Sequence, residues 1–281
     1  MSLMHLTLLD RANGLPPLRT AVVHPCDAPS LTAALEAQQR GLIEPVLVGP
    51  EARIRHVADE VGVDLEHVVV EPTPHSHASA ERAVELVHCA KVAAIMKGSL
   101  HTDELMAAIV ARDTGLRTER RISHVFVMAV PSYERLLFVT DAAVNIEPCL
   151  EEKVDIVQNA IDLAHALGIS APRVALLSAV ETVTSKLRST IDAAALCKMA
   201  DRGQITGGLL DGPLAFDNAI SLEAARTKGI VSEVAGRADI LVTPDLESGN
   251  ILAKQLEYFA SAVAGGIVLG ARVPVILSSR A

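Results

Sequence analysis

The chain has 281 residues, half of them hydrophobic and only 2% aromatic, and its formal net charge at pH 7 is −9. This length is enough for one large domain or two ordinary ones, with a core built from aliphatic side chains. The acidic balance and the lack of aromatic faces argue against a nucleic-acid or anionic-membrane surface. The most apolar stretch, around residues 260–278, contains Arg272, Pro274 and several glycines, so we expect no membrane span.

The cysteines predict neither a zinc site nor a disulfide framework, because none of them shares a CxxC spacing. They are Cys26, Cys89, Cys149 and Cys197. Free thiols fit a reducing compartment, and the N-terminus has no signal-peptide pattern, so a cytoplasmic location is expected. The acidic residues are too dispersed for a metal cluster, and the His75–His77 pair has no further ligand nearby.

The first part of the chain alternates between short apolar runs typical of strands and segments with helical spacing. Strands are expected at residues 20–24, 45–48, 68–71 and 92–96, and helices at 31–40, 52–61, 79–91 and 104–112. Ser30 is the expected N-cap of the first of these helices. This βαβα alternation predicts a parallel sheet with helices on both faces.

The middle of the chain begins with a charged connection at residues 113–122. Two apolar runs, 123–130 and 135–140, then predict an antiparallel hairpin. The alternation resumes with helices expected at 149–167, 190–202 and 221–228, and strands at 174–177 and 206–210. We therefore expect an α/β fold of two α/β/α lobes with a cleft between them.

The last segment predicts a strand at 239–243, a polar turn at 244–250, a helix at 251–264 and a strand at 273–277. Gly265 and Gly266 are expected to end the helix. Ser279 and Arg280 directly follow the final strand.

Polar residues that follow strands are the candidates for a site, because open α/β sheets bind ligands outside the carboxyl ends of their strands. Lys97, Gly98 and Ser99 precede a helix and form a candidate anion site. Asp residues at strand ends also commonly cap helices, and Arg280 is either a phosphate clamp or a surface residue. The further candidates are Ser123, Ser178, Asp211, Asp245 and Asn250.

Five segments resemble the phosphate acetyl/butyryltransferase family. They are MKGSLHTDEL (96–105), RRISHVFVM (120–128), DGPLAFDNAIS (211–221), ADILVTPDLESGNILAKQL (238–256) and GIVLGARVPVILSSRA (266–281). The resemblance implies a homodimer with a fold like that of isocitrate and isopropylmalate dehydrogenases. It also implies one domain of residues 1–118 with 267–281 and a second of residues 119–266.

The resemblance further implies reversible acyl transfer between CoA and orthophosphate in a ternary complex, with no tightly bound cofactor. Ser279 would bind the acyl or phosphate oxygens, and Arg280 would stabilise the developing charge. His101, within the first quoted segment, joins Lys97, Gly98 and Ser99 as an expected substrate-binding residue. Acyl-CoA, CoA and phosphate are thus the expected ligands.

Two positions depart from the family pattern. Met106 stands where the acetyltransferases carry an arginine, so Arg82 or Arg121 supplies that charge, or the substrate is held differently. The family's expected base is an aspartate a few residues beyond the Ser-Arg pair, and the given sequence ends at Ala281. A phosphate acetyltransferase is the leading expectation; a butyryltransferase and a non-catalytic acyl-CoA sensor are the alternatives.

Overall fold

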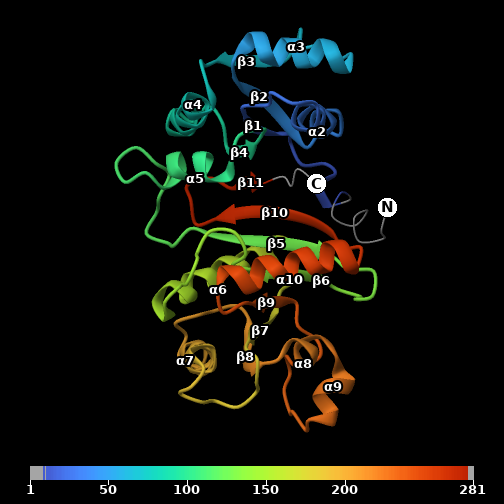
Figure 1. Ribbon diagram of the computed structural model, residues 1–281, viewed down its shortest axis with the longest axis vertical. Coiled ribbons are helices and arrows are strands. Elements are labelled where there is room, and N and C mark those ends of the chain that lie inside the picture. Colours follow the sequence, from blue (N-terminus) through green and yellow to red (C-terminus); the bar gives the residue numbers. More distant parts are fainter. Residues whose placement is uncertain (1–8, 10, 278–281) are drawn as a thin grey trace. The chain divides into compact units, whose positions relative to one another are not determined.

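The computed structural model describes residue 9 and residues 11–277. The chain divides into an N-terminal unit, residues 9–120 with 266–277, and a central unit, residues 121–265. Each unit has a sheet with helices packed against it (Figure 1). The predicted α/β class is therefore confirmed.

The sheet of the N-terminal unit is parallel except at one edge. Its strands lie in the order β3-β2-β1-β4-β11-β10, and only β10 runs antiparallel to its neighbour β11. The bounds are β1 (Leu18–Val23), β2 (Ile43–Gly49), β3 (Val69–Pro72), β4 (Ala94–Lys97), β10 (Val263–Leu269) and β11 (Val275–Leu277). Because β1 and β4 are parallel and Val23 pairs with Lys97, both strands end at the same edge.

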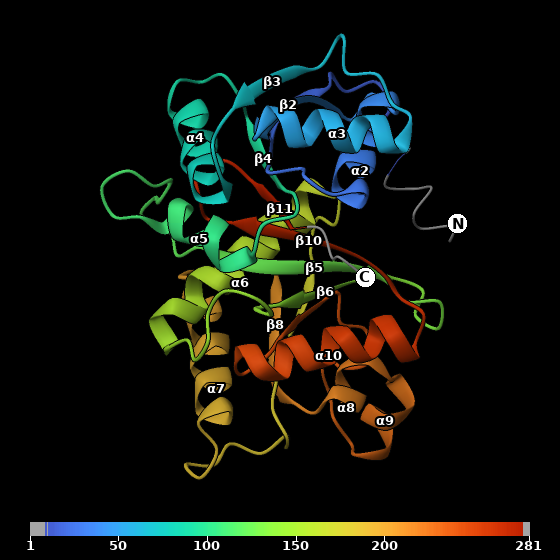
Figure 2. The same cartoon turned by 45° about the horizontal axis from the view of Figure 1, so that its top comes forward.

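Four helices cover this sheet, with α2 and α3 on one face and α4 and α5 on the other (Figure 2). They are α2 (Ala28–Gln39), α3 (Glu51–Val61), α4 (Ser76–His88) and α5 (Thr102–Val110). Asp27, not Ser30, caps α2, because its carboxylate accepts a hydrogen bond from Ser30 N. The His75 side chain likewise caps α4 by accepting from Ala78 N, so this helix begins before the predicted Ser79.

The sheet of the central unit has the strand order β5-β6-β9-β7-β8. Its strands are β5 (Ser123–Ala129), β6 (Leu136–Thr140), β7 (Arg173–Leu177), β8 (Leu209–Leu214) and β9 (Ile240–Val242). β5 and β6 form the predicted antiparallel hairpin, which is confirmed, and the other pairings are parallel. The ends of β6, β7, β8 and β9 therefore share one edge with the start of β5.

The helices of the central unit are α6 (Leu150–Ala166), α7 (Arg188–Asp201), α8 (Phe216–Ile220), α9 (Leu222–Thr227) and α10 (Leu246–Phe259). α6 and α7 pack together, and α8 packs against α9 (Figure 1). The core beneath them is aliphatic, as the composition predicts, and includes Met128, Leu137, Val139, Leu214 and Leu241. Burying such side chains contributes about 25 cal/mol per Å² of apolar area removed from water.

Three predictions in the second half of the chain are wrong. The expected turn at 244–250 is mostly helix, because the Asp245 carboxylate accepts from Ser248 N and starts α10. Gly265 and Gly266 lie inside β10 instead of ending a helix, since pairing of Gly266 with Leu277 fixes the backbone as strand. β8 begins at Leu209, so Asp211 lies within the strand opposite Ala175 and not in the loop after it.

In the part of the chain that the structure describes, no helix combines the length and the apolar character needed to cross a membrane.

Candidate functional site

The loops after β1 and β4 are in close contact at the carboxyl edge of the N-terminal sheet. Gly98 N donates to Val23 O at 2.9 Å, and Ser99 N donates to His24 O at 3.0 Å. A Cβ atom on Gly98 would lie 2.4 Å from Val23 O and 2.8 Å from His24 O. Only glycine fits here, because any side chain would push the two backbones apart.

Ser99 and Lys97 belong to this same contact. The Ser99 hydroxyl donates to His24 O at 2.8 Å and accepts from Cys26 N at 3.3 Å, so it joins the two loops. Lys97 is only 4% exposed, and its ammonium donates to Gly98 O at 3.3 Å. His101 is exposed at the N-cap position of α5 and makes no side-chain cap hydrogen bond. The structure thus brings Lys97, Gly98, Ser99 and the start of α5 together.

His24 lies at the centre of this edge and was not among the predicted site residues. Its backbone is left-handed, with φ of 56°, and its Nδ1 lies 3.4 Å from the Ser79 hydroxyl. Ser79 Oγ is also 2.8 Å from Thr73 Oγ1. Burial lowers the pKa of His24, and the charge of Arg53 lowers it further. A neutral imidazole at this position can accept or donate one hydrogen bond without adding charge.

Asp141 organises the carboxyl edge of the central sheet. It is 3% exposed, and its Oδ1 accepts from Ala143 N at 2.9 Å and Val144 N at 3.0 Å. Its Oδ2 accepts from the backbone N–H groups of His124 and Asn145, each at 3.3 Å. These donors compensate the desolvation of the carboxylate, so its main effect is to shape the loop after β6.

His124 is the neighbour of Asp141 and is 1% exposed. Its ring packs edge-on against Phe126, with ring centroids 4.5 Å apart. Burial lowers the pKa of His124 to about 4, although the negative charge of Asp141 opposes this. Within the described residues its buried Nδ1 has no hydrogen-bond partner.

Asp245 and Asn250, both predicted site residues, hold α10 against the loop after β6. The Asp245 carboxylate accepts from Ser248 N and from the Ser248 hydroxyl, both at 2.8 Å. Asn250 Nδ2 donates to Ala142 O at 3.1 Å. Gly249 permits the contact, since a Cβ there would lie 2.3 Å from Asp141 O. Through these contacts, Asp245 stabilises the start of α10 and Asn250 stabilises the packing of α10 on the loop after β6.

The other predicted residues of the central unit are more scattered. Ser178, directly after β7, lies 2.8 Å from the Ser189 hydroxyl. Ser123 is fully buried, and its hydroxyl accepts from Asn159 Nδ2 at 2.8 Å. Asp211 is half-buried within β8 and accepts from Gly212 N at 2.8 Å. Ser123 and Ser178 lie at the shared edge of the sheet, whereas Asp211 lies within β8.

A buried ion pair near Ser178 was also missed. Lys153 Nζ lies 2.7 Å from Asp192 Oδ2, with side chains only 6% and 9% exposed. The pair borders a small cavity that Ser189 and Thr243 also line. Lys153 lies on the buried face of α6 with Ile156 and Ala160. The helical spacing of the apolar residues in α6 was a sufficient signal to place Lys153 on this face.

Neither arginine proposed to replace the missing family arginine is free of protein partners. Arg82 forms ion pairs with Glu71 at 2.9 Å and Glu85 at 2.8 Å. Arg121 pairs with Glu152 at 2.8 Å and donates to Asn145 Oδ1 at 2.7 Å. A substrate phosphate would therefore have to compete with a carboxylate for either guanidinium.

The family model described as phosphate acetyl/butaryl transferase matches residues 73–281. The chain belongs to this family. The family resemblance expected from the five sequence segments is confirmed, and the match includes the Ser279-Arg280 pair. Those two residues lie outside the described part of the structure.

Individual family members differ in how similar they are to this chain. A phosphate acetyltransferase of Rhizobium meliloti is 62% identical over 274 residues, which cover 98% of this chain and 87% of that protein. A phosphate butyryltransferase of Clostridium acetobutylicum is 43% identical over 263 residues, covering 94% of this chain and 87% of that protein.

Solved structures share the fold. A branched-chain phosphotransacylase from Enterococcus faecalis V583 has a TM-score of 0.81 and 28% identity, covering 94% of this chain and 93% of that chain. A 4-hydroxythreonine-4-phosphate dehydrogenase from Klebsiella pneumoniae has a TM-score of 0.55 and 14% identity, covering 94% and 91%. The expected likeness to a dehydrogenase fold is thus confirmed at the level of fold alone.

Proposed function

We propose that this protein is a phosphate acetyltransferase, which interconverts acetyl-CoA and phosphate with acetyl phosphate and CoA. The observation that carries the proposal is the 62% identity to an acetyltransferase across nearly the whole chain. Identity to a butyryltransferase is only 43%. The acetyl group is therefore favoured over the butyryl group as the one transferred.

The reaction proceeds by direct transfer in a ternary complex. The thiolate of CoA attacks the carbonyl carbon of acetyl phosphate, the new C–S bond forms, and the C–O bond to phosphate breaks. Orthophosphate leaves with the electron pair, and the thiol proton passes to a base. Donors aimed at the carbonyl oxygen lower the barrier, because negative charge develops there.

Ser279 and Arg280 carry the chemistry in this proposal. Ser279 binds the acyl or phosphate oxygens, and Arg280 neutralises the charge on the tetrahedral intermediate. Their support is the match of the family model over this segment. Further support is the pairing of β11 with β4, in which Ile276 lies opposite Met96, one residue before Lys97.

The remaining candidates bind the substrates or shape their site. Lys97, Gly98, Ser99 and His101 contact the anionic groups of CoA or phosphate, because they combine a cation with the N-terminus of a helix. The candidates of the central unit are Ser123, Ser178, Asp211, Asp245 and Asn250. Their hydrogen bonds to the protein favour a shaping role over direct chemistry.

We further propose a homodimer that forms through α10. This helix presents Ile251, Tyr258 and Phe259 to solvent, and Phe259 is 89% exposed. Their spacing of i, i+7 and i+8 places them on one face of the helix. An apolar face of this kind is self-complementary when two copies meet about a twofold axis.

The proposed domains are residues 1–118 with 267–281 and residues 119–266. The proposed location is the cytoplasm. It is supported by the four free cysteines of the described structure, since thiols persist in a reducing compartment.

The test is an assay of CoA release from acetyl-CoA and from butyryl-CoA in the presence of phosphate. We expect acetyl-CoA to be the better substrate. Arg280→Ala should reduce kcat by about a hundred- to a thousand-fold, the typical cost of losing one donor to a developing oxyanion. Arg40→Ala, which removes an exposed charge after α2, is the matched control and should leave kcat unchanged.

Absence of turnover with either thioester would contradict the enzyme proposal. If acetyl-CoA still binds in that case, the protein is an acyl-CoA sensor built on the same fold. A preference for butyryl-CoA would leave the reaction class intact and change the acyl group.

A further inference from the structure

The loop after β1 holds His24 in one position at the carboxyl edge of the N-terminal sheet. His24 N donates to Val48 O at 2.7 Å. Its carbonyl oxygen accepts from Cys26 N at 2.8 Å and from Ser99 N at 3.0 Å. The residue is 6% exposed, and its backbone is left-handed. Because the backbone is fixed on both sides, the direction of the imidazole is set before a substrate binds.

A chain of hydroxyl groups determines which nitrogen of this imidazole carries the proton. The Ser79 hydroxyl donates to His75 O at 2.9 Å, since a carbonyl oxygen can only accept. Its single proton is then used, so Ser79 Oγ accepts from Thr73 Oγ1 at 2.8 Å and from His24 Nδ1 at 3.4 Å. A hydroxyl oxygen has the two lone pairs that this requires. The proton of the neutral imidazole therefore lies on Nδ1.

The other ring nitrogen, Nε2, is consequently a bare hydrogen-bond acceptor. It has no hydrogen-bond partner among the described residues. It points away from Ser79, because the two nitrogens lie on different sides of the ring. An acceptor in a side chain this buried is poorly hydrated, and leaving it unpaired is costly. Nε2 therefore favours a ligand that brings a hydrogen-bond donor.

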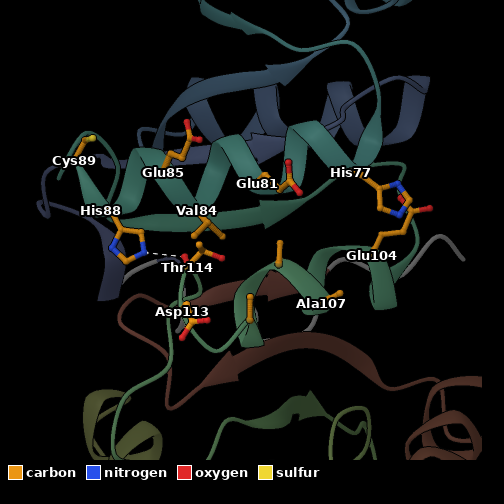
Figure 3. A pocket seen from close by; sticks show the side chains of 12 residues that line it. His77, Glu81, Val84, Glu85, His88, Cys89, Glu104, Ala107, Asp113 and Thr114 are labelled. Atoms are coloured by element: carbon orange, nitrogen blue, oxygen red, sulfur yellow. Dashed lines mark hydrogen bonds between the residues drawn. The ribbon is translucent and has the colours of Figure 1, made fainter.

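The imidazole of His24 is neutral at pH 7. Burial lowers its pKa from 6.5, and the charges of Arg53 and His75 act in the same direction, whereas Glu104 and Asp27 oppose it. Figure 3 shows Glu104 at one end of the groove between α4 and α5. A neutral ring with a bare Nε2 offers no proton to the oxygens of an ionised phosphate. Its partner is therefore an uncharged donor.

Strand pairing places His24 at the same edge of the sheet as the end of β11. β1 pairs with β4 and β4 pairs with β11, in both cases in parallel. The ends of β1 and β11 are thus separated by two strand spacings, about 10 Å. Ser279 and Arg280 follow β11 in the sequence. A substrate group held beyond these strand ends lies close both to His24 and to the end of β11.

Among the reactants, the uncharged donor at the reacting centre is the thiol of CoA. The carbonyl and phosphate oxygens of acetyl phosphate accept hydrogen bonds, whereas an S–H group donates. We propose that His24 Nε2 binds the thiol of CoA by accepting a hydrogen bond from its S–H group. This contact orients the sulfur toward the carbonyl carbon that it attacks. The inference rests on the function proposed above and adds to it the residue that holds the nucleophile.

The test is isothermal titration calorimetry of the full chain with CoA and with desulfo-CoA, in which a hydrogen atom replaces the thiol group. His24→Asn is the informative variant, because asparagine tolerates a left-handed backbone and its side chain is too short to reach the thiol. We expect His24→Asn to weaken CoA binding about fivefold, as for the loss of one hydrogen bond. Its binding of desulfo-CoA should equal that of the unaltered protein.

His67→Asn is the matched control, because it makes the same substitution at an exposed histidine. It should bind both ligands as the unaltered protein does. Ser79→Ala applies the same comparison without altering the left-handed residue. It removes the acceptor of the Nδ1 proton, so it should weaken the binding of CoA and leave that of desulfo-CoA unchanged.

An equal loss of affinity for CoA and desulfo-CoA in His24→Asn would show that His24 only supports the loop, and would overturn the proposal. Full affinity of His24→Asn for CoA would also overturn it. If the unaltered protein binds neither ligand, the acetyltransferase function proposed above fails, and this inference fails with it.

Discussion

The imidazole of His124 is buried against Phe126, next to the carboxylate of Asp141. Burial lowers its pKa to about 4 from an ordinary value of 6.5, which keeps the ring neutral at pH 7. The unfolded chain binds a proton at this residue more readily than the folded chain. Acidification therefore favours the unfolded state, and stability is lost as the pH falls from about 6.5 toward 4.

We expect the free energy of unfolding to decrease by about 3 kcal/mol from this residue between pH 7 and pH 4. Urea unfolding at a series of pH values measures the effect. His124→Gln should have a shallower dependence than the unaltered protein. His56→Gln, which replaces an exposed histidine on α3, should keep the original slope. Equal slopes for His124→Gln and the unaltered protein would refute the assignment.

At the scale of elements, the Lys153–Asp192 ion pair connects α6 to α7. Both side chains are almost fully buried, so removal of one partner leaves a charge with little solvation. Arg188 Nε, 3.6 Å from Asp192, compensates only part of this loss.

We expect Lys153→Met to lower the free energy of unfolding by about 3 kcal/mol. The double variant Lys153→Met with Asp192→Leu should recover most of that loss, because no charge is then left buried. Chemical denaturation measures both. The exposed pair of Lys198 and Asp201 on α7 supplies the control, and Lys198→Met should cost less than about 1 kcal/mol. A double variant as unstable as Lys153→Met would show that packing, not charge, holds these helices.

The elements themselves were largely predictable from the sequence. The spacing of apolar residues along the sequence distinguishes the strands from the helices. Two apolar runs joined by a polar turn predict the hairpin of β5 and β6. The errors fall where a local signal conflicts with a tertiary contact. Gly265 and Gly266 favour a helix end by themselves, yet the pairing of β10 with β11 extends a strand through them. Asp245 was assigned to a turn, although its carboxylate starts a helix.

At the scale of the whole molecule, α10 has an apolar face that the described residues leave exposed. Phe259 is 89% and Tyr258 is 67% exposed, in a chain with only six phenylalanines and tyrosines. Large exposed apolar patches commonly mark interfaces.

We expect Phe259→Glu to convert the proposed dimer into a monomer, because a carboxylate would then be buried in an apolar contact. Size-exclusion chromatography with light scattering measures the mass in solution. Val231→Glu, which changes another fully exposed apolar residue, should leave the dimer intact. A monomeric unaltered protein, or a dimer that persists in Phe259→Glu, would contradict the role of α10.

The candidate site was predictable in part. Lys97, Gly98 and Ser99 follow a strand, and the structure does bring them beside the loop after β1. His24 and Lys153 were missed, because each lies in or beside an apolar run and becomes important only through a partner far away in the sequence. Their partners Ser79 and Asp192 are 55 and 39 residues distant.

Periodicity, composition and contiguous motifs were sufficient to predict the α/β alternation, the aliphatic core and the family. Which polar groups hold the fold together, and which are left without a partner, depends on the folded structure. Ser99, Asp245 and Asn250 bind protein partners, whereas a buried oxygen of Glu104 has none among the described residues. The physical reason is that burial and hydrogen bonding depend on neighbours brought together by folding, and no local pattern records them.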